Sequence, residues 1–112
     1  MSSAVAQRLE SIRKKGGIKS RDIAQLLNTT PETVSRWQSG NVEPHSERLQ
    51  TLLTLEWLIA ELSEFYGPEE ARLWLFAPHR LLKGEPPAKR IQDGRIDDVL
   101  AILAQLRDGA YV

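Results

Sequence analysis

The stretch SRDIAQLLNTTPETVSRWQS, residues 20–39, decides the fold because its apolar positions serve two helices at once. Two helices joined by a short turn need a small residue where they cross, an apolar set that fixes their angle, and a polar outer face on the second helix. Ala24 is the small residue. The apolar set is Ile23, Leu27, Val34 and Trp37. These residues predict a helix-turn-helix, with Trp37 in the core.

Cap residues predict where these two helices begin and end. Ser20 offers an N-cap for the first helix, and Thr30 offers one for the second. Pro31 then occupies the first helical position, where its missing N–H costs nothing, and Gly40 ends the helix. Asn28 stands in the turn, where it tolerates a positive φ.

The rest of the chain continues the helical pattern. Apolar residues recur three and four positions apart, and no run alternates long enough to predict a strand. Ser2 or Ser3 caps a first helix, which Gly16 and Gly17 end. The longest pattern covers about residues 44–66 and has apolar side chains on more than one stripe, so we expect this helix to be buried on more than one side.

The dipeptide Gly67-Pro68 breaks the pattern sharply and marks a boundary. We therefore predict an all-α protein in two parts. Residues 1–66 form a helix-turn-helix domain that includes a long fourth helix, and residues 67–112 form a small helical segment. The final helix ends at Gly109. Its apolar face comprises Ile96, Val99, Leu100, Leu103 and Leu106.

Composition excludes several classes of function. Hydrophobic residues make up 41% and charged residues 27%, as in folded domains and unlike disordered chains. The chain has no cysteine, and His45 and His79 have no ligand spacing between them, so we expect neither a metal site nor a cofactor. We also expect no enzymatic activity, because no nucleophile stands beside a base and no glycine-rich phosphate loop follows a strand.

The distribution of apolar residues gives an expectation for location. The first residues lack a basic stretch followed by an apolar run, and the richest apolar stretch, residues 49–62, is broken by Glu56 and Glu61. We therefore expect a cytoplasmic protein that does not contact a membrane.

A net charge of zero hides a difference between the two halves of the chain. Residues 1–50 carry eight Lys and Arg against five Asp and Glu, whereas residues 51–112 carry seven against ten. The first half is the better candidate for a polyanionic partner.

Residues 20–40 resemble the helix-turn-helix of the phage-repressor family. The run Val34-Ser35-Arg36-Trp37 followed by Gly40 is similar to that family's recognition helix. The resemblance implies operator DNA as a partner, with Lys19 and Arg21 near phosphates. The side chains that would face DNA are Thr30, Glu32, Thr33, Ser35, Arg36 and Ser39. A helix pair that never touches nucleic acid is the alternative.

A second resemblance covers about the last forty residues. It rests on an order that includes irregular elements as well as helical spacing: Trp74, Pro78, Leu81-Leu82, Pro86-Pro87, Gly94, an apolar helix, and Gly109-Ala110-Tyr111. This order resembles the toxin-binding domain of the Xre/MbcA/ParS antitoxin family, and most closely the MbcA-type antitoxins. His79 stands where the family usually has asparagine, and Lys83-Gly84 replaces a more glycine-rich turn.

The second resemblance implies a partner, a RES-domain toxin that degrades NAD. In that family the C-terminal segment of the antitoxin occludes the active site of the toxin. We also expect this protein to regulate its own operon through the helix-turn-helix. A glycine permits a sharp exit from the helix, and tyrosine is enriched at binding hot spots. The matching residues are Arg107, Gly109, Ala110, Tyr111 and Val112.

One alternative function stays open. A stand-alone helix-turn-helix transcriptional regulator, whose C-terminal segment only dimerises, fits the same helical pattern. Because helix-turn-helix proteins commonly read two half-sites, we expect a homodimer or a higher hetero-oligomer with the toxin.

Overall fold

The structure is a computed structural model, and it describes residues 4–109. Within that range the chain contains no strand, which confirms the all-α prediction. Seven α-helices and one 3-10 turn follow in the order α1 Ala4–Gly16, α2 Ser20–Leu26, α3 Pro31–Ser39, α4 Ser46–Leu62, α5 Pro68–Phe76, η1 Arg80–Leu82, α6 Pro87–Gln92 and α7 Ile96–Arg107.

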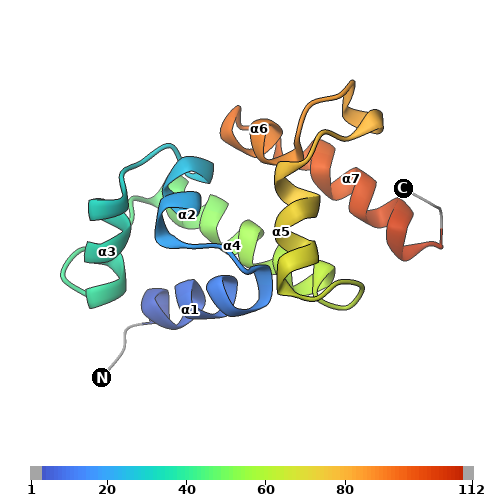
Figure 1. Ribbon diagram of the computed structural model, residues 1–112. Helices are drawn as coiled ribbons and strands as arrows, with labels where there is room; N and C mark the ends of the chain where they lie inside the picture. Colours follow the sequence, from blue (N-terminus) through green and yellow to red (C-terminus); the bar gives the residue numbers. More distant parts are fainter. Residues whose placement is uncertain (1–3, 110–112) are drawn as a thin grey trace.

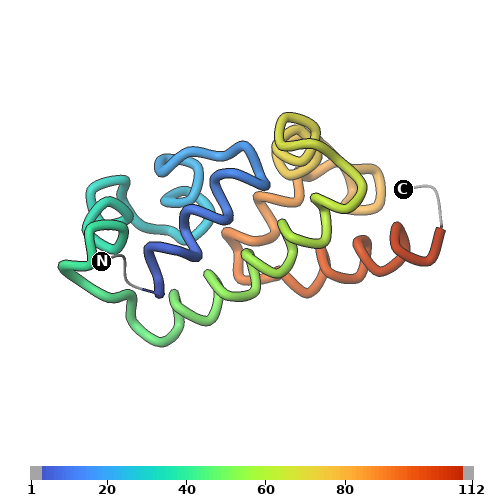
Figure 2. Tube along the Cα trace, turned by 90° about the horizontal axis from the view of Figure 1, so that it is seen from below, coloured from blue at the N-terminus to red at the C-terminus, as the bar shows by residue number. Residues whose placement is uncertain are grey.

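The molecule is elongated, with principal extents of 42 × 25 × 20 Å. Figures 1 and 2 both place α3 at one end of the long direction and the last turn of α7 at the other. Helix α4 runs between them, and α1 and α7 both pack against it. The two surfaces that the sequence singled out therefore lie far apart.

One cluster of buried side chains runs through the whole molecule, from Val5 of α1 to Leu103 of α7. Its centre is a single stripe of α4: Leu52, Leu55, Leu58, Ile59 and Leu62. The cluster also includes Ala71 and Leu75 of α5, so α5 shares the core of the preceding helices. The division at Gly67 stays a prediction.

Within the described residues, α4 is not buried on the second apolar stripe that the sequence pattern indicated, so that expectation is wrong. Leu53 and Trp57 face away from the buried stripe and are 38% and 44% exposed. Their spacing of four places them on one face of α4, and this face stays partly exposed although Arg107 of α7 contacts the Trp57 ring. The helix is also shorter than the pattern at residues 44–66 indicated.

The helix ends follow the cap residues, with one exception. Thr30 caps α3, Pro31 begins it, and Gly40 ends it in the left-handed region, as predicted. Ser20, however, is the first residue of α2 and not its cap. Lys19 is the N-cap, and the carboxylate of Asp22, the third residue of the helix, accepts from the backbone N–H of Lys19 at 3.0 Å. The predicted cap at Ser2 or Ser3 lies outside the described residues.

The loop between α1 and α2 touches the start of α5. Gly17 has a φ of +62°, and a Cβ placed on it would lie 2.6 Å from the carbonyl oxygen of Pro68. Only glycine fits both the left-handed backbone and this close approach. Gly16-Gly17 and Gly67-Pro68, two breaks in the helical sequence pattern, therefore lie against each other in the fold.

Candidate functional site

Helix α3 has a buried face and a polar face. Val34 and Trp37 are 0% and 2% exposed, which confirms that Trp37 belongs to the core. Of the side chains expected to face DNA, Thr33 is half-buried. The others are exposed: Thr30, Glu32, Ser35, Arg36 and Ser39. The structure therefore brings the predicted residues together at one end of the molecule.

Three of these side chains also serve their own helix. The Thr30 hydroxyl accepts from the backbone N–H of Thr33 at 3.2 Å and lies 2.9 Å from the Thr33 hydroxyl. The Ser39 hydroxyl donates to the carbonyl of Arg36 at 3.0 Å. Any base contact by these groups competes with those bonds, so Arg36 has the strongest capacity to read a base edge.

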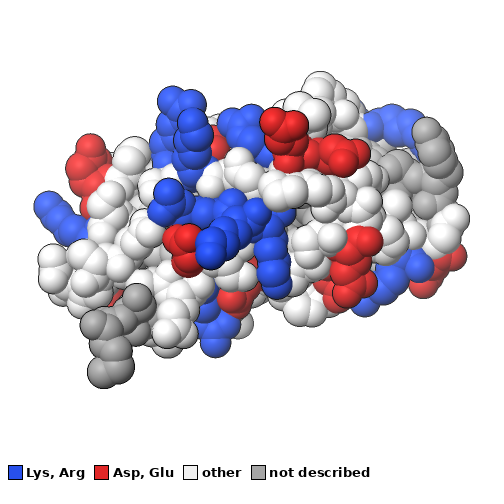
Figure 3. Space-filling model, turned by 60° about the horizontal axis from the view of Figure 1, so that its bottom comes forward, with Lys and Arg blue, Asp and Glu red and all other residues white. Residues whose placement is uncertain are grey.

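Basic side chains gather at the end of α1 and the start of α2. Arg13, Lys14 and Lys15 end α1, and Lys19 and Arg21 flank the start of α2. We call these five residues the basic ridge. Figure 3 shows Lys and Arg clustered in the middle of the face that contains α1. Sequence reasoning singled out only Lys19 and Arg21, although three adjacent cations in a last helical turn were a readable signal.

The turn between α2 and α3 is held by hydrogen bonds from two other elements. Asn28 has a φ of 55°, as its place in the turn predicted. Its side-chain amide donates to the carbonyl of Gln92 at 2.7 Å, and the Gln92 amide donates back to the carbonyl of Gln25 at 3.0 Å. Arg48 of α4 donates to the carbonyls of Leu27 and Asn28 at 3.2 and 2.9 Å. We call this set of bonds the turn anchor.

An ion pair links α5 to the start of α2. Asp22 is only 5% exposed and lies 3.3 Å from a guanidinium nitrogen of Arg72. The same guanidinium stands 5.1 Å from the centre of the Phe76 ring. Asp22 thus both caps α2 and fixes α5 against it.

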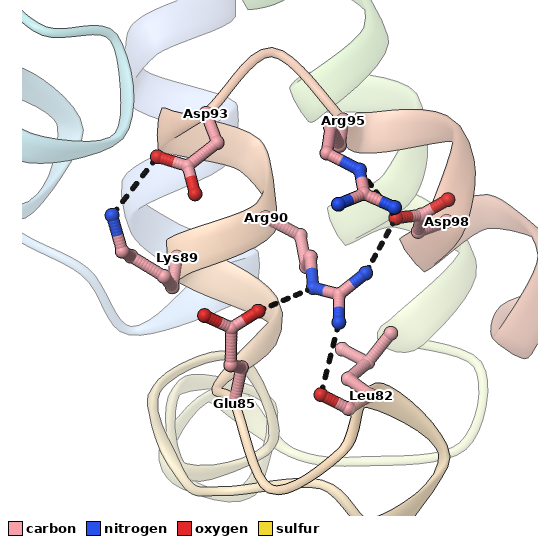
Figure 4. A network of polar contacts seen from close by, with 7 residues as sticks. All are labelled: Leu82, Glu85, Lys89, Arg90, Asp93, Arg95 and Asp98. Carbon is pink, nitrogen blue, oxygen red and sulfur yellow. Dashed lines mark hydrogen bonds and ion pairs between the residues drawn. The ribbon is translucent and has the colours of Figure 1, made fainter.

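A buried arginine organises the segment after α5. Arg90 is 8% exposed and donates to Glu85 at 2.7 Å, to Asp98 at 2.7 Å and to the carbonyl of Leu82 at 3.0 Å (Figure 4). The hydrogen bond to Asp98 and the contacts with Glu85 raise the pKa of Arg90, so the guanidinium stays charged. One side chain therefore joins η1, α6 and α7.

His79 caps the short η1 turn. Its Nδ1 accepts from the backbone N–H of Leu81 at 3.2 Å, and its ring meets Trp74 edge to face at 5.9 Å between centroids. Burial, and then the neighbouring Arg80, lower the pKa of His79 below its usual 6.5. The neutral ring that can accept this hydrogen bond is therefore the favoured form.

The end of α7 carries the predicted toxin-binding residues that the structure describes. Arg107 lies 3.7 Å from a carboxylate oxygen of Glu61 and 5.6 Å from the centre of the Trp57 ring. Gly109 is exposed and has a φ of +88°, a conformation suited to a sharp exit from the helix. Ala110, Tyr111 and Val112 lie outside the described residues.

Residues 4–109 hold no cluster of three or more His, Cys, Asp or Glu side chains that could hold a metal ion. Among the described helices, none combines the length and apolar character needed to cross a membrane. A hollow of about 840 Å³ forms an open groove between α4 and α7 that begins beside the turn anchor.

Comparison with known proteins gives a family model that matches residues 62–109. It describes the C-terminal toxin-binding domain of Xre/MbcA/ParS antitoxins. The matched range covers α5 to α7 and includes the Arg90 contacts, Arg107 and Gly109.

Relatives of nearly the same length extend the likeness to the first half. The mycobacterial cidal antitoxin MbcA of Mycobacterium tuberculosis is 30% identical over 96 residues, which cover 86% of this chain and 85% of the relative. A probable mycobacterial cidal antitoxin of the same organism is 32% identical over 99 residues, 88% of this chain and 84% of the relative. The crystal structure of the M. tuberculosis MbcT–MbcA toxin–antitoxin complex contains a chain with a TM-score of 0.84 and 27% identity, over 98% of this chain and 99% of that one.

Proposed function

The chain belongs to the Xre/MbcA/ParS family of antitoxins, and we propose that it neutralises a RES-domain toxin that degrades NAD. One observation carries the proposal: a toxin-binding domain model matches residues 62–109, where the fold ends in an exposed helix terminus. This match favours an antitoxin over a stand-alone transcriptional regulator.

The proposed mechanism is obstruction. Gly109 has a left-handed φ of +88°, and Ala110, Tyr111 and Val112 follow it in sequence. In this mechanism Tyr111 enters the active-site cleft of the toxin and excludes NAD by occupying its volume. The apolar ring fills the cleft and the hydroxyl finds a polar partner. The antitoxin makes and breaks no covalent bond, so we propose that it is not an enzyme.

Truncation tests the mechanism. We expect a chain that lacks residues 109–112 to bind its purified cognate RES-domain toxin more weakly and to leave the NAD turnover of that toxin largely uninhibited. Tyr111→Ala in the full chain is the matched control, because it removes the ring and keeps the backbone. Full inhibition by the truncated chain would show that the antitoxin acts elsewhere.

We further propose that the α2–α3 pair binds operator DNA and so regulates the operon. Arg36 reaches the bases, while the basic ridge lies against phosphates. Because α3 and the end of α7 are at opposite ends of a 42 Å molecule, one chain has room for DNA and toxin together. Operator DNA and NAD are both in the cytoplasm, where we expect the protein to act.

Two substitutions separate the roles proposed for DNA binding. We expect Arg36→Ala to weaken binding to the promoter fragment about 10-fold and to relax its sequence preference. Lys14→Ala should weaken binding to all sequences alike and reduce the slope of log affinity against log salt by about one. Fluorescence anisotropy over a salt series measures both quantities. Equal effects of both variants on cognate and random DNA would contradict the assignment of Arg36.

We propose a homodimer or a higher hetero-oligomer with the toxin as the working form. Two copies would place two α3 helices on half-sites about one helical turn apart. Sedimentation of the free chain and of its toxin complex measures the stoichiometry, and a monomer in both samples would contradict the proposal.

A further inference from the structure

One exposed surface continues from the toxin-binding segment onto α4. It consists of Leu53 and Trp57 on one face of α4 and Arg107 at the end of α7, and we call it the Trp57 surface. Arg107 lies inside the range that the toxin-binding model matches, whereas Leu53 and Trp57 lie outside it. The 5.6 Å contact between the Arg107 guanidinium and the Trp57 ring makes them one surface.

This surface has the chemistry of a binding anchor. Trp57 is 44% exposed, and the cation stacked on its ring limits the orientations that the ring adopts. An ordered side chain loses less entropy when a partner covers it. Arg107 keeps donor capacity for that partner, because its 3.7 Å separation from Glu61 is longer than a hydrogen bond. Tryptophan and arginine are the residue types most enriched at binding hot spots.

The position of the surface identifies its partner. Tyr111 follows Gly109 by two residues, so the two Cα atoms are at most about 7 Å apart. A protein whose cleft holds Tyr111 therefore lies against the end of α7. Arg107 stands two residues before Gly109 and touches Trp57, so the rim of that cleft comes next to the Trp57 surface.

We propose that the Trp57 surface is a second contact with the toxin, seated on the rim of the cleft. The rim would supply an apolar side chain that covers Trp57 and a carboxylate that pairs with Arg107. This inference rests on the proposed function, because it takes the cleft to hold Tyr111. Recognition of the toxin then extends beyond residues 62–109 onto the long helix that also supports the α2–α3 pair.

Dissociation of the complex tests the proposal. The full-length chain and its Trp57→Ala variant are immobilised, and the dissociation rate of the neighbouring gene's toxin is measured by biolayer interferometry. We expect Trp57→Ala to accelerate dissociation about 30-fold, the scale of a hot-spot residue. Val42→Ala is the matched control, since Val42 is 46% exposed on the connection after α3, and we expect it to stay within about twofold of wild type. Far-UV circular dichroism verifies that both variants are folded.

The outcomes separate this proposal from the proposed function. A wild-type chain that does not bind the toxin contradicts both. Wild-type binding with Trp57→Ala within about twofold overturns the Trp57 surface alone. The same holds if Trp57→Ala converts a dimer of the free chain into monomers without changing toxin dissociation, because a second copy is then the partner. Faster dissociation for both Trp57→Ala and Arg107→Ala supports the proposal. If the free-energy effect of the double variant is smaller than the sum of the two single effects, the two side chains form one continuous contact.

Discussion

The α2–α3 pair and the segment from α5 to α7 reach an ordered structure by different means. The pair depends on apolar residues at helical spacing and on caps within a few residues of each helix end. The segment contains shorter helices and a 3-10 turn, joined through one buried cation, Arg90. The exposed side chains Glu32, Ser35 and Arg36 of α3 can therefore change with little effect on the fold. Thr30 caps α3, and Arg90 holds the toxin-binding segment together, so changes at these two positions affect the fold directly.

The largest effect should come from the core that the two regions share. We expect Leu58→Ala to lower the free energy of unfolding by about 3 kcal/mol, because it leaves a cavity in a fully buried site. Urea titration followed by circular dichroism should give a single unfolding transition for the wild type and for the Leu58→Ala variant. Leu53→Ala on the exposed face of the same helix is the control and should cost less than about 1 kcal/mol. Two separate transitions would show that the regions fold independently.

Arg90→Lys should have the next largest effect on stability, and it should affect the toxin-binding segment more than the α2–α3 pair. Lysine keeps the charge, but one ammonium group cannot replace a planar guanidinium that reaches three acceptors. We expect the Tm to fall by roughly 5–10 °C and toxin binding to weaken more than DNA binding. Arg95→Lys is the control, because its exposed pair with Asp98 contributes little. A Tm within about 1 °C of wild type would show that the three contacts are dispensable.

Substitutions at Asn28 address the connection between the two regions. Asn28→Gly keeps the positive φ and loses the bond to Gln92, so we expect a cost of about 1 kcal/mol. Asn28→Ala loses the bond and also strains the backbone, which adds about 1–2 kcal/mol. Urea titrations of the two variants give the difference. Equal stabilities would mean that the left-handed backbone at Asn28 is not strained for other residues.

The smallest effect should be a pH dependence of stability that arises from His79, the cap of η1. Because the pKa of His79 is lowered in the folded state, the unfolded chain binds the proton more readily. The contribution of His79 is therefore fully present above its unfolded value of about 6.5 and is lost as the pH falls from there through the folded pKa. Thermal melts from pH 7.5 to 5 measure it. His79→Asn keeps an acceptor for the Leu81 N–H and should reduce the slope; an unchanged slope would assign it to other groups.

The sequence predicts the regular part of the fold well, for reasons that lie in single residues. Thr30, Pro31 and Gly40 mark the ends of α3 because cap preferences act locally. Trp37 is recognisable as a core residue because it lies three positions from Val34 on one helical face. The prediction of Ser20 as the cap is wrong because cap preference alone does not reveal that the helix begins one residue earlier, with Asp22 bonded to the N–H of Lys19.

The contacts between elements could not be predicted in the same way. Arg90 meets Glu85 five residues before it and Asp98 eight residues after it, across a turn that no helical spacing rule describes. The second apolar stripe of α4 indicated burial, but a pattern cannot say whether the covering partner is the same chain or another. Of the toxin-binding residues, Arg107 and Gly109 lie together at the end of α7, and their role stays a prediction.

The close approach of Gly17 to Pro68, together with the turn anchor, bears on how such proteins diversify. A chimera that joins the first half of one relative to the second half of another must keep a glycine at the first position and matching hydrogen-bond partners at the turn. A residue with a side chain at position 17 would clash with Pro68 and displace the start of α5. Under the proposed function, an exchange of the DNA-binding half and the toxin-binding half between relatives therefore works only where the residues at both of these contacts match.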